Sequence, residues 1–245
     1  MCAVNADGAR LVLWDVDRTL LHVEGVSRLV YEDAFLAVVG RPLERLADMA
    51  GRTDRYIITE TLKLHGVEGV EGLLEPFYWE LGRAVRSRRE LLRAQGRALA
   101  GAREALEAVA RVPGVVQSVV TGNTREIATE KLSAFGLDVH LDLEVGGYGN
   151  DATVRRELVR LARDRTQRMY GVDLAWERVV VVGDTEHDIR GAVDNGAMAV
   201  GVATGGSEED GLRDAGAATV LPDLTDTSDV VRAVLSTTAA ERSPR

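Results

Sequence analysis

Five short runs of apolar residues, most of them β-branched, predict buried strands. Apolar runs that do not alternate with polar positions are typical of parallel strands covered by helices on both faces. A sixth run, at residues 141–145, alternates and predicts a weaker strand at the edge of the sheet. The five runs lie at residues 11–14, 115–120, 179–182, 198–202 and 218–221.

Amphipathic helical patterns separate these runs. Three of the patterns end at a glycine, at Gly136, Gly171 and Gly196, which is a common helix stop. Regular alternation of strands and helices predicts the α/β class, with a doubly wound, Rossmann-like parallel sheet and right-handed crossovers. The helical patterns lie at residues 102–111, 124–135, 154–170 and 186–195.

The interval between the first two strands departs from this alternation, because residues 22–97 contain no strand-like run. Pro76 suits the first turn of a helix, and we expect Tyr78 and Trp79 of the same helix to pack in the interior. The interval therefore predicts an all-helical insertion. Its helical patterns lie at residues 26–39, 53–65 and 76–95.

We expect two domains from this organisation. Residues 1–21 and 98–245 form the α/β core, and residues 22–97 form a second, smaller all-helical cap domain. Gly25 and the stretch 96–101, which contains two glycines, are candidate hinges, although glycines at these places also serve as ordinary helix punctuation.

Composition narrows the class of function. The 245 residues are 45% hydrophobic and 28% charged, as in a folded globular protein. The net charge of −9 disfavours nucleic acid as a partner, since a basic surface supplies most of that attraction. No apolar run reaches the ~18 residues of a membrane span, and no signal segment is visible, so we expect a cytoplasmic protein with no membrane partner. The single cysteine, Cys2, leaves no internal disulfide.

Acidic residues follow two of the predicted strands directly. Asp15 and Asp17 follow the first strand, and Asp184 and Asp188 follow the third. Ligands of open α/β sheets bind beyond the carboxyl ends of the strands, which is where these acids lie. Two plainer interpretations remain open, because the first pair suits a solvated loop and Asp184 suits the N-cap of the next helix.

The second strand ends in Thr121-Gly122-Asn123. A hydroxyl and a backbone amide at a helix N-terminus can bind an anion, and the same residues can simply cap the helix. If the three strands are neighbours, at least three carboxylates lie within several ångströms and repel one another. A hard divalent cation relieves that repulsion, so we expect a Mg²⁺ site beside an anion pocket.

Three ordered motifs resemble those of the haloacid dehalogenase superfamily, in its phosphatase branch with an α-helical cap and most like the phosphoglycolate phosphatases. The helical insertion lies where many members of that family have their cap. The motifs are Asp15-x-Asp17-x-Thr19, Thr121-Gly122-Asn123 and Gly183-Asp184-x-x-x-Asp188.

The resemblance implies a role for each motif residue. Asp15 would be the nucleophile that forms an aspartyl-phosphate, and Asp17 would be the general acid and then the general base. Asp17 also favours a phosphatase over a dehalogenase, because halide needs no proton to leave. Metal ligands would be Asp15, Asp184 and the backbone carbonyl of Asp17, with Asp188 as a further ligand or as a partner bridged to the metal by water. Phosphate-binding residues would be Thr121, Gly122 and Asn123.

The chain departs from the family pattern at two positions. Arg18 stands where many relatives have glycine, and it is strained if that position needs a positive φ. The family also has a lysine before its last motif, whereas this chain has no lysine after Lys131. We expect Arg156 to replace it as a catalytic residue, with Arg155 as the alternative, and we expect Lys131 to be a solvated helix residue.

The loop at Gly51 to Asp54 joins two helical patterns of the insertion, where relatives select their substrate. Arg52 would meet an anionic group and Thr53 would donate a hydrogen bond, unless Thr53 is only a helix cap and Arg52 is only exposed. The expected function is a Mg²⁺-dependent phosphatase, monomeric or homodimeric, acting on phosphoglycolate, a sugar phosphate or a nucleotide. The alternatives are a phosphomutase of the β-phosphoglucomutase type and a phosphate-binding protein without turnover.

Overall fold

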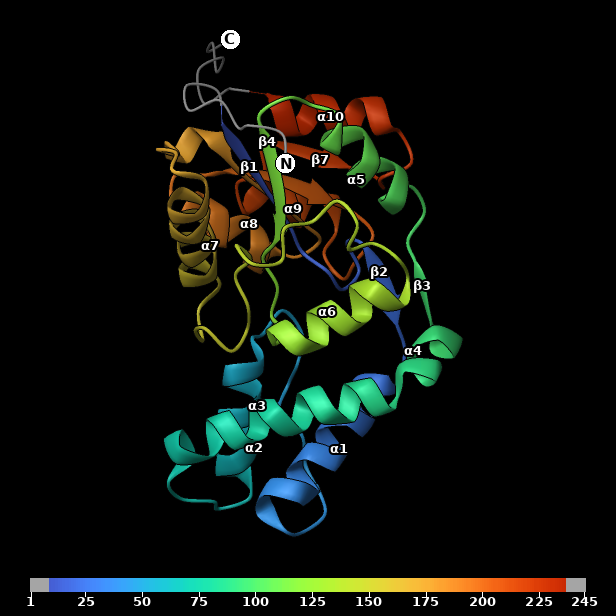
Figure 1. Ribbon diagram of the computed structural model, residues 1–245, viewed down its shortest axis with the longest axis vertical. Coiled ribbons are helices and arrows are strands. Elements are labelled where there is room, and N and C mark those ends of the chain that lie inside the picture. The colour runs from blue at the N-terminus through green and yellow to red at the C-terminus, as the bar shows by residue number, and fades with distance from the viewer. Residues whose placement is uncertain (1–8, 237–245) are drawn as a thin grey trace.

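The computed structural model describes residues 9–236 and has the α/β fold that the sequence predicts. Five parallel strands form one sheet in the order β4-β1-β5-β6-β7 (Figure 1). All five predicted strands are confirmed, while Cys2 lies outside the described residues. The strands are β1 (Arg10–Trp14), β4 (Val115–Val119), β5 (Val179–Gly183), β6 (Met198–Val202) and β7 (Thr219–Leu221).

Helices cover both faces of the sheet, which explains the unbroken apolar runs of its strands. Alternate residues of β1 point to opposite faces, so that Val12 and Trp14 pack in one apolar core and Leu11 and Leu13 in the other. On the first face lie α5 (Ala102–Ala110), α6 (Arg125–Ala134) and α10 (Thr227–Leu235). On the second face lie α7 (Arg155–Tyr170), α8 (Glu186–Val193) and α9 (Glu209–Asp214), and η1 (Trp176–Arg178) leads into β5.

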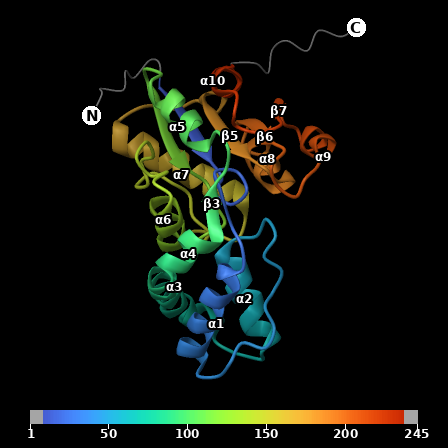
Figure 2. The ribbon, with the colours of Figure 1, turned by 90° about the vertical axis from the view of Figure 1, so that its right-hand side faces the viewer.

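Four helices between β1 and α5 form a separate helical region below the sheet (Figure 2). It has its own apolar core, in which Phe35, Ile58, Phe77 and Leu81 are fully buried, and Ile127 of α6 packs against it. The sequence predicts this insertion, and the bounds 22–97 for a cap domain remain a proposal. The helices are α1 (Val26–Val39), α2 (Asp54–Leu64), α3 (Val70–Ser87) and α4 (Arg89–Gln95).

The two chain segments that enter and leave the helical region pair with each other. β2 (Leu21–Val23) and β3 (Gly96–Ala98) form an antiparallel ribbon, in which His22 lies opposite Arg97. The sequence gives no sign of this ribbon, because three-residue strands are too short to show a period. The ribbon ties the start of the region to its end, although 72 residues separate Val23 from Gly96 in between.

Three local expectations are wrong. Residues 141–145 form no strand, and the only pairing nearby is an isolated bridge between Val120 and Gly147. Helix α3 begins at Val70, so Pro76 lies inside it rather than in its first turn. Trp79 is 68% exposed, although Tyr78 is buried as expected.

The position of Pro76 follows from the apolar pattern of α3. A proline inside a helix removes one hydrogen bond and costs about 3 kcal/mol. Buried residues occur on both sides of it, with Leu74 before it and Phe77, Leu81 and Val85 after it on the same face. Burial of these side chains offsets the lost hydrogen bond, so the helix continues through the proline.

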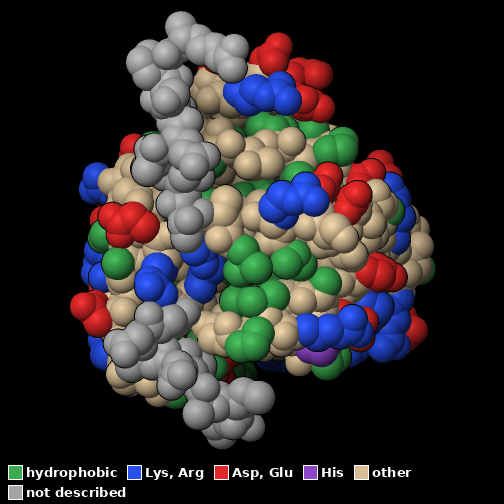
Figure 3. Space-filling model, turned by 90° about the horizontal axis from the view of Figure 1, so that it is seen from above, with side chains coloured by type: hydrophobic (Ala, Val, Ile, Leu, Met, Phe, Trp, Pro, Cys, Tyr) green, Lys and Arg blue, Asp and Glu red, His purple; other side chains and the backbone are tan. Residues whose placement is uncertain are grey.

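The surface at the sheet end of the molecule carries acidic and basic side chains next to one another (Figure 3). On α10, which lies at this end, Arg232 pairs with Asp229 one turn before it. Such exposed pairs contribute little to stability. Within residues 9–236, no helix has the length and apolar character needed to cross a membrane.

Candidate active site

The carboxyl ends of three neighbouring strands meet at one edge of the sheet. β1 lies between β4 and β5, and Trp14 is in register with both Val119 and Val182. The backbone N–H of Asp15 donates to the carbonyl of Val182 at 2.8 Å, which extends this register by one residue. The three motifs that follow these strands are therefore brought together, as parallel alignment requires.

Asp15, Asp184 and Asp188 form a buried acidic cluster at this edge. Each offers one carboxylate oxygen, and these three oxygens lie within 4.8 Å of one another. Burial raises the pKa of Asp184 to about 7, with the neighbouring Asp188 adding to the effect. Burial, followed by repulsion from Asp188, also raises the pKa of Asp15 well above its usual range. Protonation is the response of a buried acidic cluster whose negative charge is only partly compensated.

The cluster suits a divalent cation. Asp184 Oδ2 is buried and has no hydrogen-bond partner among residues 9–236, and Asp188 Oδ1 is buried with only an ion pair to Arg155, at 3.1 Å. Unpaired buried carboxylate oxygens are costly in a folded protein unless an ion uses them. Gly205 leaves the space beside Asp184 open, since a Cβ there would lie 1.6 Å from Oδ2. Oxygen ligands of this kind are those that Mg²⁺ prefers.

Two threonines orient Asp184 and Asp188. Thr19 is fully buried, and its hydroxyl donates to Asp184 Oδ1 at 3.0 Å. Thr185 is the N-cap of α8, and its hydroxyl donates to Asp188 Oδ2 at 2.6 Å. Because Thr185 caps this helix, Asp184 is not needed as a cap, and its second oxygen faces the cluster.

Arg155, the first residue of α7, reaches the acidic cluster. Its Nη1 lies 3.3 Å from Asp15 Oδ1, and its Nη2 lies 3.1 Å from Asp188 Oδ1. The side chain of Arg156 is 52% exposed, and its acidic neighbour is Glu157 at 3.7 Å. Successive helix residues point about 100° apart, so only one of the two arginines can face the site. The structure corrects the expectation that Arg156 lies here, because Arg155 does.

Lys131 of α6 is buried against Asp17, so the expectation of a solvated lysine is wrong. Lys131 is 4% exposed, and its Nζ lies 2.8 and 2.7 Å from the two carboxylate oxygens of Asp17. The same Nζ donates to Asn123 Oδ1 at 2.9 Å. Asn123 Nδ2 in turn donates to Asp17 Oδ2 at 2.6 Å and to Thr121 Oγ1 at 2.9 Å.

This contact changes the state of Asp17. Burial opposes ionisation of its carboxyl, but the charge of Lys131 and the hydrogen bond from Asn123 outweigh burial and lower the pKa of Asp17. Asp17 is therefore ionised at neutral pH and able to accept a proton. Its carboxylate lies outside the group formed by Asp15, Asp184 and Asp188.

Arg18 adopts a left-handed backbone with φ of 67°, which no other described non-glycine residue does. The strain expected for Arg18 if this position needs a positive φ is therefore present, since a residue with a Cβ is strained in this conformation. The N–H of Arg18 donates to the carbonyl of Leu21 at 2.7 Å and closes the turn. Arg18 lies between Asp17, which contacts Asn123, and Thr19, which contacts Asp184.

In the loop before α2, Thr53 is the N-cap of the helix, accepting from Tyr56 N–H at 3.3 Å. The guanidinium of Arg52 lies over the Tyr56 ring, 4.9 Å from its centroid. His187 of the core packs against Gly51, where a Cβ would lie 2.4 Å from the imidazole. Thr53 therefore has the capping role given above as the alternative, and substrate contact by Arg52 and Thr53 remains a proposal.

Asp54 joins the helical region to the loop after β4. Its N–H donates to the carbonyl of Gly122 at 2.7 Å, and its carboxylate accepts from Thr124 N–H and from the Tyr31 hydroxyl, each at 2.6 Å. Burial raises the pKa of Asp54 to about 6 despite these hydrogen bonds. The loop that carries the candidate phosphate ligands is thus held directly by the helical region.

Gly149→Ala is expected to disturb this junction. Arg55 N–H donates to the carbonyl of Gly149, and a Cβ at position 149 would lie 1.7 Å from Gly122 O and 2.8 Å from Asp54 N. Overpacking costs about 1–3 kcal/mol, and movement of Gly122 should raise KM for a phosphate ester. Urea unfolding and steady-state kinetics measure both effects. Gly206→Ala is the control, since a Cβ there meets nothing within 4 Å; equal results for the two variants would contradict the expectation.

Without metal, the free energy of unfolding is expected to fall as the pH rises from about 4 to about 7. Asp15 and Asp184 have raised pKa values in the folded protein, that of Asp184 being about 7, so the folded state holds protons that the unfolded state releases. Their contribution to stability is present at low pH and is lost as the pH rises. Mg²⁺ binds ionised carboxylates, so it should raise Tm more at about pH 8 than at about pH 5. Thermal unfolding in EDTA and in Mg²⁺ measures this difference.

Asp184→Asn provides the comparison for this experiment. The variant removes a group whose pKa is raised and also removes one anionic ligand. Its Tm in EDTA should depend less on pH, and its gain in Tm from Mg²⁺ should be smaller than that of the wild type. A gain from Mg²⁺ that is the same at both pH values would argue against the acidic cluster as the binding site.

Comparisons with known proteins agree with this arrangement. The sequence profile of the haloacid dehalogenase-like hydrolases matches residues 12–192. A 5'-nucleotidase from Pseudomonas aeruginosa is 31% identical over 209 residues, which cover 82% of this chain and 86% of that protein.

Two solved structures share the fold. A hydrolase from Pseudomonas syringae has a TM-score of 0.63 and 21% identity, with 93% of this chain and 100% of that chain covered. A predicted phosphoglycolate phosphatase from Haemophilus somnus has a TM-score of 0.58 and 19% identity, with 91% and 98% covered. At such identities the likeness concerns the fold alone.

Proposed function

Because the chain belongs to the haloacid dehalogenase-like hydrolase family, we propose that it is a Mg²⁺-dependent phosphatase of a small phosphorylated metabolite. The reaction would pass through an aspartyl-phosphate on Asp15. The observation that carries this proposal is the buried cluster of Asp15, Asp184 and Asp188 at the end of neighbouring strands, beside the loop that holds Thr121.

These three acids, with the backbone carbonyl of Asp17, would hold the Mg²⁺. When bound, the ion would neutralise negative charge on the transferring phosphoryl group. The Thr121 hydroxyl and the Gly122 N–H would hold phosphate oxygens at the N-terminus of α6. Arg155 would orient Asp15 and contribute positive charge, as a lysine does in relatives; its planar fork spans Asp15 and Asp188, which a single ammonium spans less easily.

The proposed hydrolysis of the phosphate ester has two steps. First, an oxygen of Asp15 attacks phosphorus, the bond from phosphorus to the ester oxygen breaks, and Asp17 gives its proton to the leaving oxygen. Second, Asp17 takes a proton from water, the water oxygen attacks the same phosphorus, and inorganic phosphate leaves while Asp15 is regenerated.

The ionised state of Asp17 suits the second step directly. For the first step Asp17 must be protonated. A phosphate ester that binds beside it brings additional negative charge, which raises the pKa of a carboxyl group. Substrate binding would therefore supply the condition for proton donation.

For the substrate, we propose a nucleoside 5'-monophosphate as the first class to test. The 5'-nucleotidase relative covers most of this chain at 31% identity, which favours this class over phosphoglycolate or sugar phosphates. Arg52 and Thr53 lie at the edge of the helical region and would contact the part of the substrate that leaves.

A panel of phosphorylated metabolites, assayed with Mg²⁺ and with EDTA, tests the proposal. We expect Mg²⁺-dependent release of inorganic phosphate, with the highest kcat/KM on a nucleoside monophosphate. An isomerised sugar phosphate without phosphate release would indicate a phosphomutase instead. No turnover on any ester, together with measurable Mg²⁺ binding, would overturn the proposal in favour of a phosphate-binding protein.

A further inference from the structure

All three N–H donors of the Lys131 ammonium group have acceptors at Asp17 and Asn123. An ammonium group has three N–H donors. The Nζ of Lys131 has three acceptors within 2.9 Å, namely both carboxylate oxygens of Asp17 and Oδ1 of Asn123. The lysine therefore has no donor left for a substrate group, and its contacts all serve to fix neighbouring side chains.

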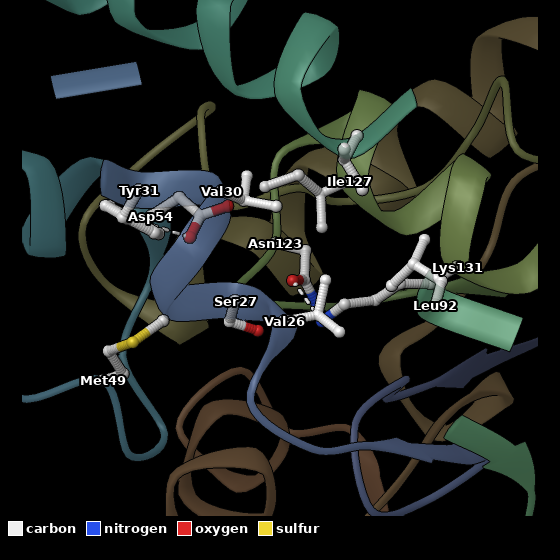
Figure 4. A pocket seen from close by; sticks show the side chains of 11 residues that line it. Val26, Ser27, Val30, Tyr31, Met49, Asp54, Leu92, Asn123, Ile127 and Lys131 are labelled. Carbon is white, nitrogen blue, oxygen red and sulfur yellow. Dashed lines mark hydrogen bonds between the residues drawn. The ribbon is translucent and has the colours of Figure 1, made fainter. Parts of the chain in front are cut away.

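Asn123 extends this arrangement to the phosphate-binding loop. Its amide donates to Asp17 and to Thr121. Its oxygen accepts from Lys131 (Figure 4). The four side chains come from the turn after β1, the loop after β4 and helix α6. A displacement of any one of them moves the hydrogen bonds of the others.

The burial of the two charges is unequal. The side chain of Lys131 is 5% exposed, whereas that of Asp17 is 40% exposed. Lys131 therefore contacts the buried side of the Asp17 carboxylate, and the other side of that carboxylate is accessible to solvent. Lys131 and Asn123 also line a pocket with residues of the helical region, such as Val26 and Met49 (Figure 4).

A purely structural role does not explain a buried ammonium here. Lys131 lies between Ile127 and Leu132 on the buried side of α6. A buried ion pair contributes little or no net stability compared with apolar side chains of similar volume. The chain otherwise relies on arginine for positive charge and contains only one other lysine, Lys63, which is exposed.

We propose that Lys131 is a positioning residue that holds the Asp17 carboxylate, through Asn123 and directly, in the orientation required for proton transfer to the leaving oxygen. This inference rests on the proposed function, in which Asp17 is the acid and base. Correct placement of a proton donor contributes on the order of 100-fold or more to a rate, and it matters most for leaving groups that are strong bases.

The test compares two phosphate esters with different leaving groups. p-Nitrophenyl phosphate releases a stable phenolate that needs no proton, whereas a nucleoside monophosphate or glycerol phosphate releases an alkoxide that does. The constant kcat/KM reports the steps up to formation of the aspartyl-phosphate, so it isolates the acid role of Asp17 from its later role with water. The variants are Lys131→Met and Lys131→Gln, with Lys63→Met as the matched control.

We expect Lys131→Met to lower kcat/KM about 100-fold on the alkyl ester and less than about 10-fold on p-nitrophenyl phosphate. Lys131→Gln retains N–H donors without the charge, so it should show the same dependence on leaving group with a smaller loss. If Lys131→Met unfolds, Lys131→Gln decides alone. Lys63→Met should match the wild type on both esters.

Equal losses on the two esters, or no loss, would overturn the inference. Asp17→Asn, assayed in parallel, separates this failure from that of the proposed function. If Asp17→Asn loses more activity on the alkyl ester and the lysine variants do not, only the role of Lys131 is wrong. If Asp17→Asn shows no dependence on the leaving group, the proposed acid itself is wrong.

Discussion

Asp15→Asn should lower kcat at least about 10,000-fold while the protein keeps its fold. The amide has nearly the shape of the carboxylate but cannot attack phosphorus, so no aspartyl-phosphate can form. The substitution also removes one of three mutually repelling acids, since the pKa of Asp15 is raised by burial and by Asp188. Without metal we therefore expect Tm at neutral pH to rise rather than fall.

Steady-state kinetics, acid quenching followed by intact-protein mass spectrometry, and thermal unfolding in EDTA measure these effects. Wild type should show a phosphorylated species under rapid quenching, and Asp15→Asn should show none. Asp210→Asn is the control, because its side chain is 95% exposed and lies outside the site. A variant at Asp15 with near wild-type turnover would remove the mechanism proposed above.

Arg155→Met should lower kcat/KM about 1,000-fold, and Arg156→Met should leave it nearly unchanged. Arg155 contacts Asp15 and Asp188, so its loss leaves two buried acids without a compensating cation. Removing one partner of a buried ion pair costs about 3–5 kcal/mol, and saturating Mg²⁺ should restore part of that stability.

Arg156→Met is a matched control because it changes the same residue type at the next position of the same helix. Its side chain is 52% exposed and has no contact with the acidic cluster. The two variants are compared in Mg²⁺ by kinetics and in EDTA by thermal unfolding. Similar losses in both variants, or a larger loss in Arg156→Met, would contradict the placement of Arg155.

Local sequence pattern was sufficient for the fold class. Each apolar run indicates a strand that is buried on both faces, and each glycine after a helical pattern indicates the end of a helix. These signals are readable because the burial and the backbone conformation of a segment depend on only a few neighbouring residues. The same logic placed Asp15, Thr121 and Asp184 at strand ends. It failed for residues 141–145, where alternation alone does not make a strand, and for α3, where apolar packing continues through Pro76.

The partners of the site residues were not readable from local pattern. Arg155 and Arg156 are adjacent and chemically identical, and only the packing of α7 against the sheet decides which one faces Asp15. The residues around Lys131 are those of an ordinary amphipathic helix, although the spacing of Lys131 from Ile127 and Ala128 places it on the buried side of α6. A lysine at such a position in an arginine-rich chain was the available signal.

The sequence by itself determined the five strands of the parallel sheet, the helical insertion and the acids that stand at strand ends, because these properties depend on neighbours along the chain. The tertiary structure alone decided that β1 lies between β4 and β5, that Lys131 supports Asp17, and that Asp54 docks on the loop after β4. Those contacts join residues far apart in sequence, for example Asp17 and Lys131, which are 114 positions apart, so no periodicity encodes them. These contacts depend on how the helices pack against the sheet, because steric fit and electrostatic attraction act between residues that are close in space.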